Sequence, residues 1–170
     1  VESRRRTTTE TGFEDIQVYF IRVWVCNRGK TSAEGVQVYA ATLRRSSGGR
    51  FLDVPEFPPM NLRWSHSDAV ITDAIPPGMG KHCDLGSIGK RAPNETGVTA
   101  DNAVLLTLSL KSAPFIGGHE LTAGVYELVL QVGATNSRPI VKTIRITLSG
   151  RWSVDVNAMF TQHAQFSLGN

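Results

Sequence analysis

The chain has 170 residues, of which 41% are hydrophobic and 19% charged, and its 18 lysines and arginines against 15 aspartates and glutamates give a net charge of +3. This composition excludes a disordered or collagen-like chain and fits one folded domain of ordinary size. The apolar runs are too short to cross a membrane as a helix, and the basic excess is well below that of a dedicated nucleic-acid binder.

The first segment, residues 1–12, contains the triplet Arg4, Arg5 and Arg6, then three threonines, and Val1 is its only apolar residue. Such a segment cannot bury a core, so we expect a flexible basic arm or linker over 1–12, a sandwich domain over 13–158 and a C-terminal extension over 159–170. Because the sequence starts at Val1 and not at a methionine, we expect a fragment or a processed product. Arginines also mark the cytoplasmic side of transmembrane segments, so an upstream anchor is one interpretation and a solvated linker the other.

Apolar and polar side chains alternate with period two along much of the chain, and β-branched and aromatic residues are common there, which predicts strands. In chain order the predicted strands cover residues 16–26, 36–43, 62–64, 82–88, 104–111, 126–132 and 140–148. We expect the first two, joined by a turn over 27–30, to form an antiparallel pair. Polar stretches over 44–60 and 89–102 should be loops, and a short helix or a frayed tail should follow residue 158. One apolar face per strand predicts an all-β fold, an immunoglobulin-like antiparallel β-sandwich of about seven to nine strands.

Three short motifs carry a resemblance to a known group of domains: Asn27-Arg28-Gly29 before Ala33-Glu34, Ile75-Pro76-Pro77-Gly78, and Gly124-Val125-Tyr126-Glu127-Leu128. They resemble motifs of prokaryotic immunoglobulin-like and CARDB-like sandwich domains over about residues 13–158. Such domains often follow a pair of N-terminal transmembrane helices. The resemblance therefore implies a sandwich fold and a place on the cytoplasmic face of a membrane protein or, alternatively, at the cell surface. It implies no catalytic residues.

His82, Cys83 and Asp84 form the densest cluster of ligand-type side chains. In a strand, His82 and Asp84 share one face and Cys83 points to the other. A zinc site would need further ligands such as His66 or His119, and no metal-ligand spacing supports one. A Cys83 nucleophile would need a base on its own face, which its neighbours do not supply. We therefore expect no catalytic residue, metal ligand or cofactor, and keep His82 and Asp84 as candidate binding residues.

Trp24 is predicted on the strand face opposite Tyr19, Ile21, Val23 and Val25, so an exposed Trp24 would mark a ligand or partner surface. With Trp64 and Trp152 it could form a carbohydrate platform if two of the rings were exposed and coplanar. The polar stretch after residue 43 adds the candidate binding residues Arg44, Arg45 and Arg50. Because no aromatic residues are interleaved with these arginines, we expect no nucleic-acid partner.

Together these features predict a non-catalytic interaction or accessory module of a larger prokaryotic protein, to which a membrane anchor could be attached upstream. The expected partner is another protein or an upstream domain of the same chain, and an unpaired sheet edge could also support a homodimer. The first alternative is a module that binds a carbohydrate or another ligand. A hydrolase or a metal-binding domain is the less favoured alternative. Cys26 and Cys83 could be free thiols or one disulfide between the sheets.

Overall fold

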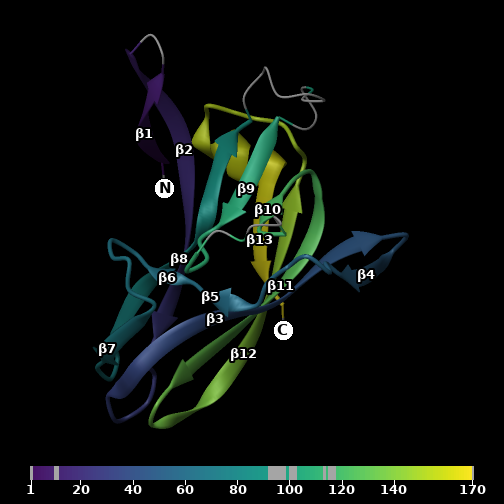
Figure 1. Cartoon of the computed structure of the whole chain (residues 1–170). Coiled ribbons are helices and arrows are strands. Elements are labelled where there is room, and N and C mark those ends of the chain that lie inside the picture. Colours follow the sequence, from purple (N-terminus) through teal and green to yellow (C-terminus); the bar gives the residue numbers. More distant parts are fainter. Residues whose placement is uncertain are drawn as a thin grey trace.

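The computed structural model describes residues 2–9, 12–91, 99, 103–112, 114 and 118–169. Nearly all of its regular structure is strand (Figure 1). The strands are β1 (Glu2–Thr9), β2 (Gly12–Cys26), β3 (Ala33–Ser47), β4 (Arg50–Asp53), β5 (Met60–Asn61), β6 (Arg63–Trp64), β7 (Ile71–Ile75), β8 (Gly80–Lys90), β9 (Val104–Leu108), β10 (Glu120–Leu121), β11 (Gly124–Ala134), β12 (Ser137–Leu148) and β13 (Ala164–Leu168). A short helical segment, α1 (Val156–Ala158) and the π-helix η1 (Met159–His163), precedes β13.

The strands form two antiparallel sheets. The six-stranded sheet has the order β1-β2-β8-β9-β10, with β6 added to β8. The seven-stranded sheet has the order β13-β12-β11-β3-β4, with β5 and β7 added to β3. The predicted all-β sandwich is thereby confirmed. It has more strands than the seven to nine predicted, because the terminal segments and several two-residue segments also pair.

The core lies between the sheets and follows the period-two alternation of the sequence. Every second side chain is buried on β9, over residues 126–130 of β11 and over residues 144–148 of β12, while the residues between them are partly or fully exposed. The largest fully buried side chains include Trp64, Tyr19, Leu106, Leu128 and Ile146. The short predicted strand with a buried tryptophan is therefore confirmed at β6.

The predicted antiparallel pair of residues 16–26 and 36–43 is wrong. The first segment belongs to β2, which pairs with β1 and β8, and the second belongs to β3, which pairs with β11 in the other sheet. The turn between them therefore crosses from one sheet to the other. Asn27 fixes this turn, because its side-chain amide donates to the carbonyls of Thr31 and Ile75.

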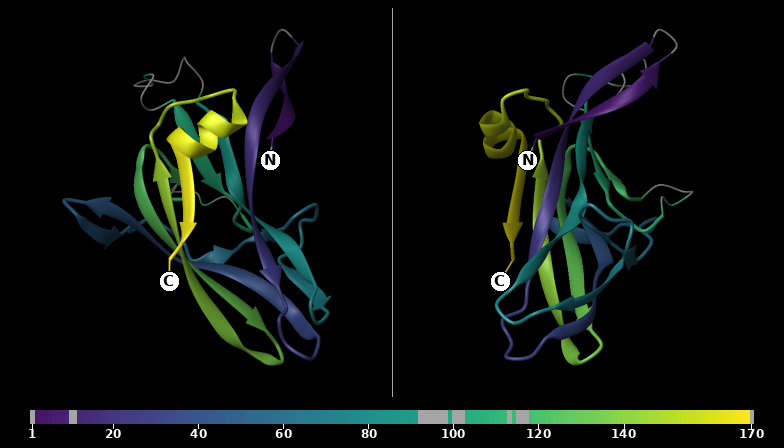
Figure 2. Two further views of the ribbon diagram at one scale, coloured as in Figure 1. Left: turned by 180° about the vertical axis from the view of Figure 1, so that it is seen from behind. Right: turned by 90° about the vertical axis from the view of Figure 1, so that its left-hand side faces the viewer.

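The N-terminal segment differs from its expected form, whereas the C-terminal extension contains the expected short helical segment and also packs on the core. Residues 2–9, expected as a flexible arm, form β1, which pairs with β2 up to the Glu2–Tyr19 pair and projects with it beyond the sandwich (Figure 2). The extension over 159–170 contributes to the core, since Met159 and Ala164 are fully buried. Trp152 packs on Tyr19 with a ring distance of 5.0 Å, so it covers the end of the core as predicted.

The two predicted long loops have different outcomes. Residues 44–53 are mostly the β3–β4 hairpin, in which Arg44 pairs with Asp53 and Ser47 with Arg50. The hairpin projects from the side of the sandwich opposite to β1 (Figures 1 and 2). Most of the predicted loop over 89–102 lies outside the described residues.

Candidate binding groove

The two sheets diverge at one end of the sandwich, between β2 and β12. On the inward face of β12, Ile144 and Ile146 are buried, whereas Ile140 is 59% exposed. On the inward face of β2, Tyr19 is fully buried, whereas Val23 and Val25 are only partly buried. Residues that the alternation assigns to the core are thus left open to solvent at this end.

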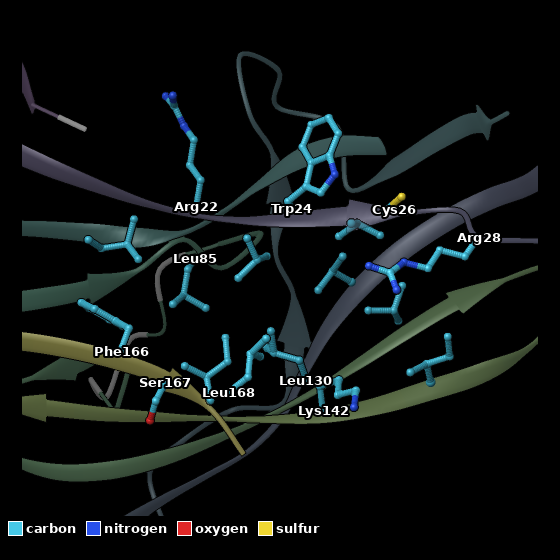
Figure 3. Close-up of a pocket in the computed structure, with 17 residues that line it drawn as sticks. Arg22, Trp24, Cys26, Arg28, Leu85, Leu130, Lys142, Phe166, Ser167 and Leu168 are labelled. Atoms are coloured by element: carbon cyan, nitrogen blue, oxygen red, sulfur yellow. The ribbon is translucent and has the colours of Figure 1, made fainter. Parts of the chain in front are cut away.

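The opening forms a groove of about 540 Å³ (Figure 3). Its walls are the inward faces of β2 and β12, its floor is made by core residues of β3, β8 and β11, and the end of β13 closes one side. Its apolar side chains are Ile21, Val23, Val25, Val38, Leu85, Leu130, Val132, Ile140, Ile144, Phe166 and Leu168. A groove of this size and composition is typical of a ligand or partner site.

One wall of the groove is a free strand edge. The register of β1 with β2 ends at Tyr19, and no other strand in the described part of the chain pairs with this edge of residues 20–26. The Asn27 N–H donates to the Met79 carbonyl at 2.9 Å on the β8 side. Backbone groups alternate sides along a strand, so the N–H and C=O groups of Val25 and Val23 also point to β8. The N–H and C=O groups of the residues between and beside them point to the groove edge, namely those of Arg22, Trp24 and Cys26.

Figure 3 shows the side chains of Arg22 and Trp24 pointing away from the groove, as this alternation requires. Both residues are among those that line the groove, and with their side chains turned away it is their backbone that can face it. The free edge therefore offers three donor and acceptor pairs beside an apolar surface.

The opposite wall offers less free backbone. The Thr143 carbonyl accepts from the Gly169 N–H at 2.7 Å, on the β13 side of β12. The backbone groups of Val141, two residues earlier, therefore point to the same side of β12. Two residues before Val141 is Pro139, which has no N–H to donate there. Hence the edge of β2, which contains no proline, is the better template for an added strand.

The cations Arg28 and Lys142 are the charged side chains at the groove mouth. Figure 3 shows both toward the end away from Phe166, Arg28 from the turn after β2 and Lys142 from β12. Lys142 occupies an inward position between Ile140 and Ile144. No lining residue is acidic, and among the described residues neither cation makes an ion pair. The groove is apolar with a positive mouth.

The candidate residues His82 and Asp84 lie beside Trp24 on the outer face of β2 and β8. Trp24 is 57% exposed, and its ring lies 4.6 Å from that of His82. The Asp84 carboxylate accepts from Arg22 Nε at 2.9 Å and from the Ser65 hydroxyl at 2.5 Å. Asp84 thus holds a local hydrogen-bond network, and the neighbouring rings of Trp24 and His82 are both exposed on this face.

The remaining candidates, Arg44, Arg45 and Arg50, lie on the β3–β4 hairpin. Arg44 forms an ion pair with Asp53 at 3.0 Å. Arg45 donates to the Ala123 carbonyl and lies 5.6 Å from the centre of the Tyr126 ring. These residues are on the opposite side of the molecule from β1 (Figure 1).

Neither the carbohydrate platform nor the nucleophile has the required geometry. Of the three tryptophans, Trp24 alone is exposed, because Trp64 is fully buried and Trp152 partly buried. Burial, and then the charge of Asp84, raises the pKa of the Cys83 thiol to about 12. A thiol in this state is not an active nucleophile. Cys26 is exposed and both cysteines are free, so the disulfide alternative is wrong.

The described residues contain no group of three or more side chains that could hold a metal ion. Neither helical segment in that part of the chain is long and apolar enough to cross a membrane. Comparison with family models, curated proteins and solved structures gives no match. The resemblance to CARDB-like domains therefore stays a prediction, while the two-sheet sandwich is observed.

Sequence reasoning did not identify the groove. A signal was present at Lys142, a charged residue at an inward position of an otherwise apolar series from Ile140 to Leu148. The free edge of β2 left no such signal, because the alternation of a strand does not tell whether its edge is paired.

Proposed function

We propose that this chain is a non-catalytic interaction module that binds an extended segment of a partner protein along the free edge of β2. The proposal rests on the position of that edge directly beside the open apolar groove. A segment paired with Arg22, Trp24 and Cys26 would send every second side chain into the groove. Backbone hydrogen bonds would then supply affinity, and the groove would supply specificity.

The added strand continues the ladder that β1 begins. Because β1 is antiparallel to β2 and its first residue, Glu2, lies opposite Tyr19, a segment that continues this ladder in the same direction runs antiparallel to residues 20–26. At about 3.4 Å per residue this edge is roughly 24 Å long. A partner segment of about seven to nine residues covers it.

The apolar groove provides the driving force. Ile140 and Leu168 are 59% and 70% exposed, although each belongs to a strand of the sandwich. Complete burial of a side chain of this size contributes about 1.5–3 kcal/mol. Covering two half-exposed residues therefore contributes about as much as complete burial of one.

Two observations favour this function over the alternatives. The buried, protonated Cys83 gives the thiol no catalytic role. Trp24, as the single exposed tryptophan, does not form the paired platform that a carbohydrate site of this type uses. A second copy of the chain could also present an edge, and the experiment below separates that case from a partner peptide.

The experiment is selection from a phage-displayed library of random nine-residue peptides on the immobilised chain. We expect enriched sequences with apolar residues at every second position, which bind as synthetic peptides in calorimetry. Methylation of one set of alternate peptide nitrogens, the set that faces β2, should abolish binding, and methylation of the other set, which points to solvent, should leave binding in place. Enrichment without alternation, or binding that survives methylation of each of the two sets, would overturn the proposal.

A matched pair of variants locates the site. Ile140→Ser removes an exposed apolar residue of the groove, and Val154→Ser removes one that is 71% exposed outside it. We expect weaker peptide binding for I140S and unchanged binding for V154S. Sedimentation of the free chain over a range of concentrations tests for self-association, and a stable dimer that excludes the peptides would assign the edge to a second copy instead.

A further inference from the structure

The two unpaired cations at the groove mouth define the chemistry of the partner. We infer that the partner segment carries an aspartate or glutamate next to Arg28 and Lys142, followed at every second position by apolar residues. This inference rests on the proposed function. It adds a sequence preference that strand addition alone does not require.

Lys142 is the first part of the evidence. It follows the alternation of β12 and therefore faces the groove, where its neighbours on the same face are Ile140 and Ile144. A lysine can keep its ammonium group in water while its stem lies along an apolar wall. Its charge is thus held at the mouth of a groove that has no acidic lining residue.

Arg28 is the second part, and its backbone is held in place. The preceding residue, Asn27, donates from its backbone N–H to Met79 and from its side-chain amide to Thr31 and Ile75. The Asn27 side-chain oxygen also accepts from the Gly29 N–H at 2.8 Å. The residues on both sides of Arg28 are therefore fixed, and the guanidinium lies over the groove end nearest Cys26 (Figure 3).

The strand register converts these positions into a sequence pattern. In an antiparallel pair, partner residues opposite Val25, Val23 and Ile21 point to the inward face. The position opposite Val25 is nearest to the turn that carries Arg28, and the other two lie over the apolar part of the groove. Because the partner runs antiparallel to β2, its pattern from N- to C-terminus is acidic-x-apolar-x-apolar.

Charge complementarity favours a peptide carboxylate over a neutral residue at this position. Both cations lie within one groove end, and neither has an ion partner among the described residues. A carboxylate there meets two positive charges on exposed side chains, so two modest attractions add up. Salt should weaken this part of the binding and leave the apolar part unchanged.

Two synthetic peptides with blocked ends test the inference. One is Ser-Glu-Ser-Val-Ser-Val-Ser, whose residues lie opposite residues 26 to 20 of β2, and the other has glutamine in place of glutamate. Calorimetry with the wild-type chain should give a dissociation constant about fivefold to tenfold lower for the glutamate peptide in low salt. The difference should shrink in R28Q and in K142Q and disappear in the double variant. The glutamine peptide should bind all four proteins equally.

The outcomes separate the two proposals. Equal affinity of the two peptides for the wild-type chain, or a glutamate preference that persists in the double variant, overturns the acidic preference and leaves strand addition standing. If neither peptide binds and the library yields no alternating sequence, the proposed function itself fails. An Arg44→Gln variant on the distant hairpin controls for the loss of positive charge and should behave as wild type.

Discussion

Ile140 and Ile144 face the same way from β12, yet Ile140 is 59% exposed and Ile144 is 4% exposed. The alternation of β12 continues without a break between them, so the difference in exposure comes from the six-stranded sheet. This sheet covers Ile144 and diverges from β12 at Ile140. The groove is thus produced by the divergence of two sheets over an apolar strand. A closed sandwich with the same strand pattern would bury both residues.

The first prediction concerns these two isoleucines. Ile144→Ala should lower the free energy of unfolding by about 2–5 kcal/mol, because it leaves a cavity in a packed core. Ile140→Ala should change it by less than about 1 kcal/mol, since most of that side chain is already in water. Urea denaturation followed by circular dichroism measures both. Equal losses would mean that the groove is closed in solution.

The second prediction compares two glycines of β8. A Cβ at Gly86 would overlap the Thr107 carbonyl oxygen of β9, whereas one at Gly89 would have no atom within 4 Å. Gly86→Ala should therefore destabilise the chain by about 1–3 kcal/mol, and Gly89→Ala should be neutral or slightly stabilising. Thermal melts of the two variants check the contact between β8 and β9. A neutral Gly86→Ala would contradict the close approach of these strands.

The third prediction compares two ion pairs. Asp84 and Arg22 have side chains only 20% and 23% exposed, and Asp84 also accepts from the buried Ser65. Asp84→Ala should cost about 1–3 kcal/mol, because it leaves polar groups without partners. Asp53→Ala, which breaks the exposed pair with Arg44, should cost less than about 0.5 kcal/mol. Denaturant midpoints of both variants distinguish the two ion pairs. A smaller loss of stability for Asp84→Ala than for Asp53→Ala would contradict the hydrogen-bond network around Asp84.

The fourth prediction is the stability at alkaline pH. The folded state raises the pKa of Cys83 from 9.0 to about 12 through burial and the nearby Asp84. Below pH 9 the thiol is protonated in both states and adds no pH dependence. Between pH 9 and 12 the unfolded thiol loses its proton first, so stability falls by about 1.4 kcal/mol per pH unit. The measurement is the slope of unfolding free energy against pH relative to Cys83→Ala, and identical slopes would contradict the raised pKa.

Local patterns predicted the strands well and their partners poorly. The alternating segments at 104–111, 126–132 and 140–148 became β9, β11 and β12, because one buried face per strand leaves a direct imprint on the sequence. The turn at Asn27 was also visible. It gave no information on whether the next strand would stay in the same sheet, which depends on contacts such as Asn27 to Ile75 that are distant in sequence.

The candidate site was only partly accessible from the sequence. Trp24 was correctly placed on an outer face, since its neighbours at odd positions are apolar and inward. The groove depends on where two sheets separate and where β1 stops along β2, and no single strand encodes either. Only Lys142, a charge within an inward apolar series, carried a local trace of the opening.

The central claim is that β2 has a free edge that accepts a strand, and amide hydrogen exchange followed by NMR tests it most directly. In the free chain, the amides of Arg22, Trp24 and Cys26 should exchange fast while those of Val23 and Val25, which face β8, exchange slowly. A saturating alternating peptide should slow exchange at Arg22, Trp24 and Cys26 by at least about tenfold. Fast exchange at these three amides in the presence of bound peptide would contradict strand addition at β2.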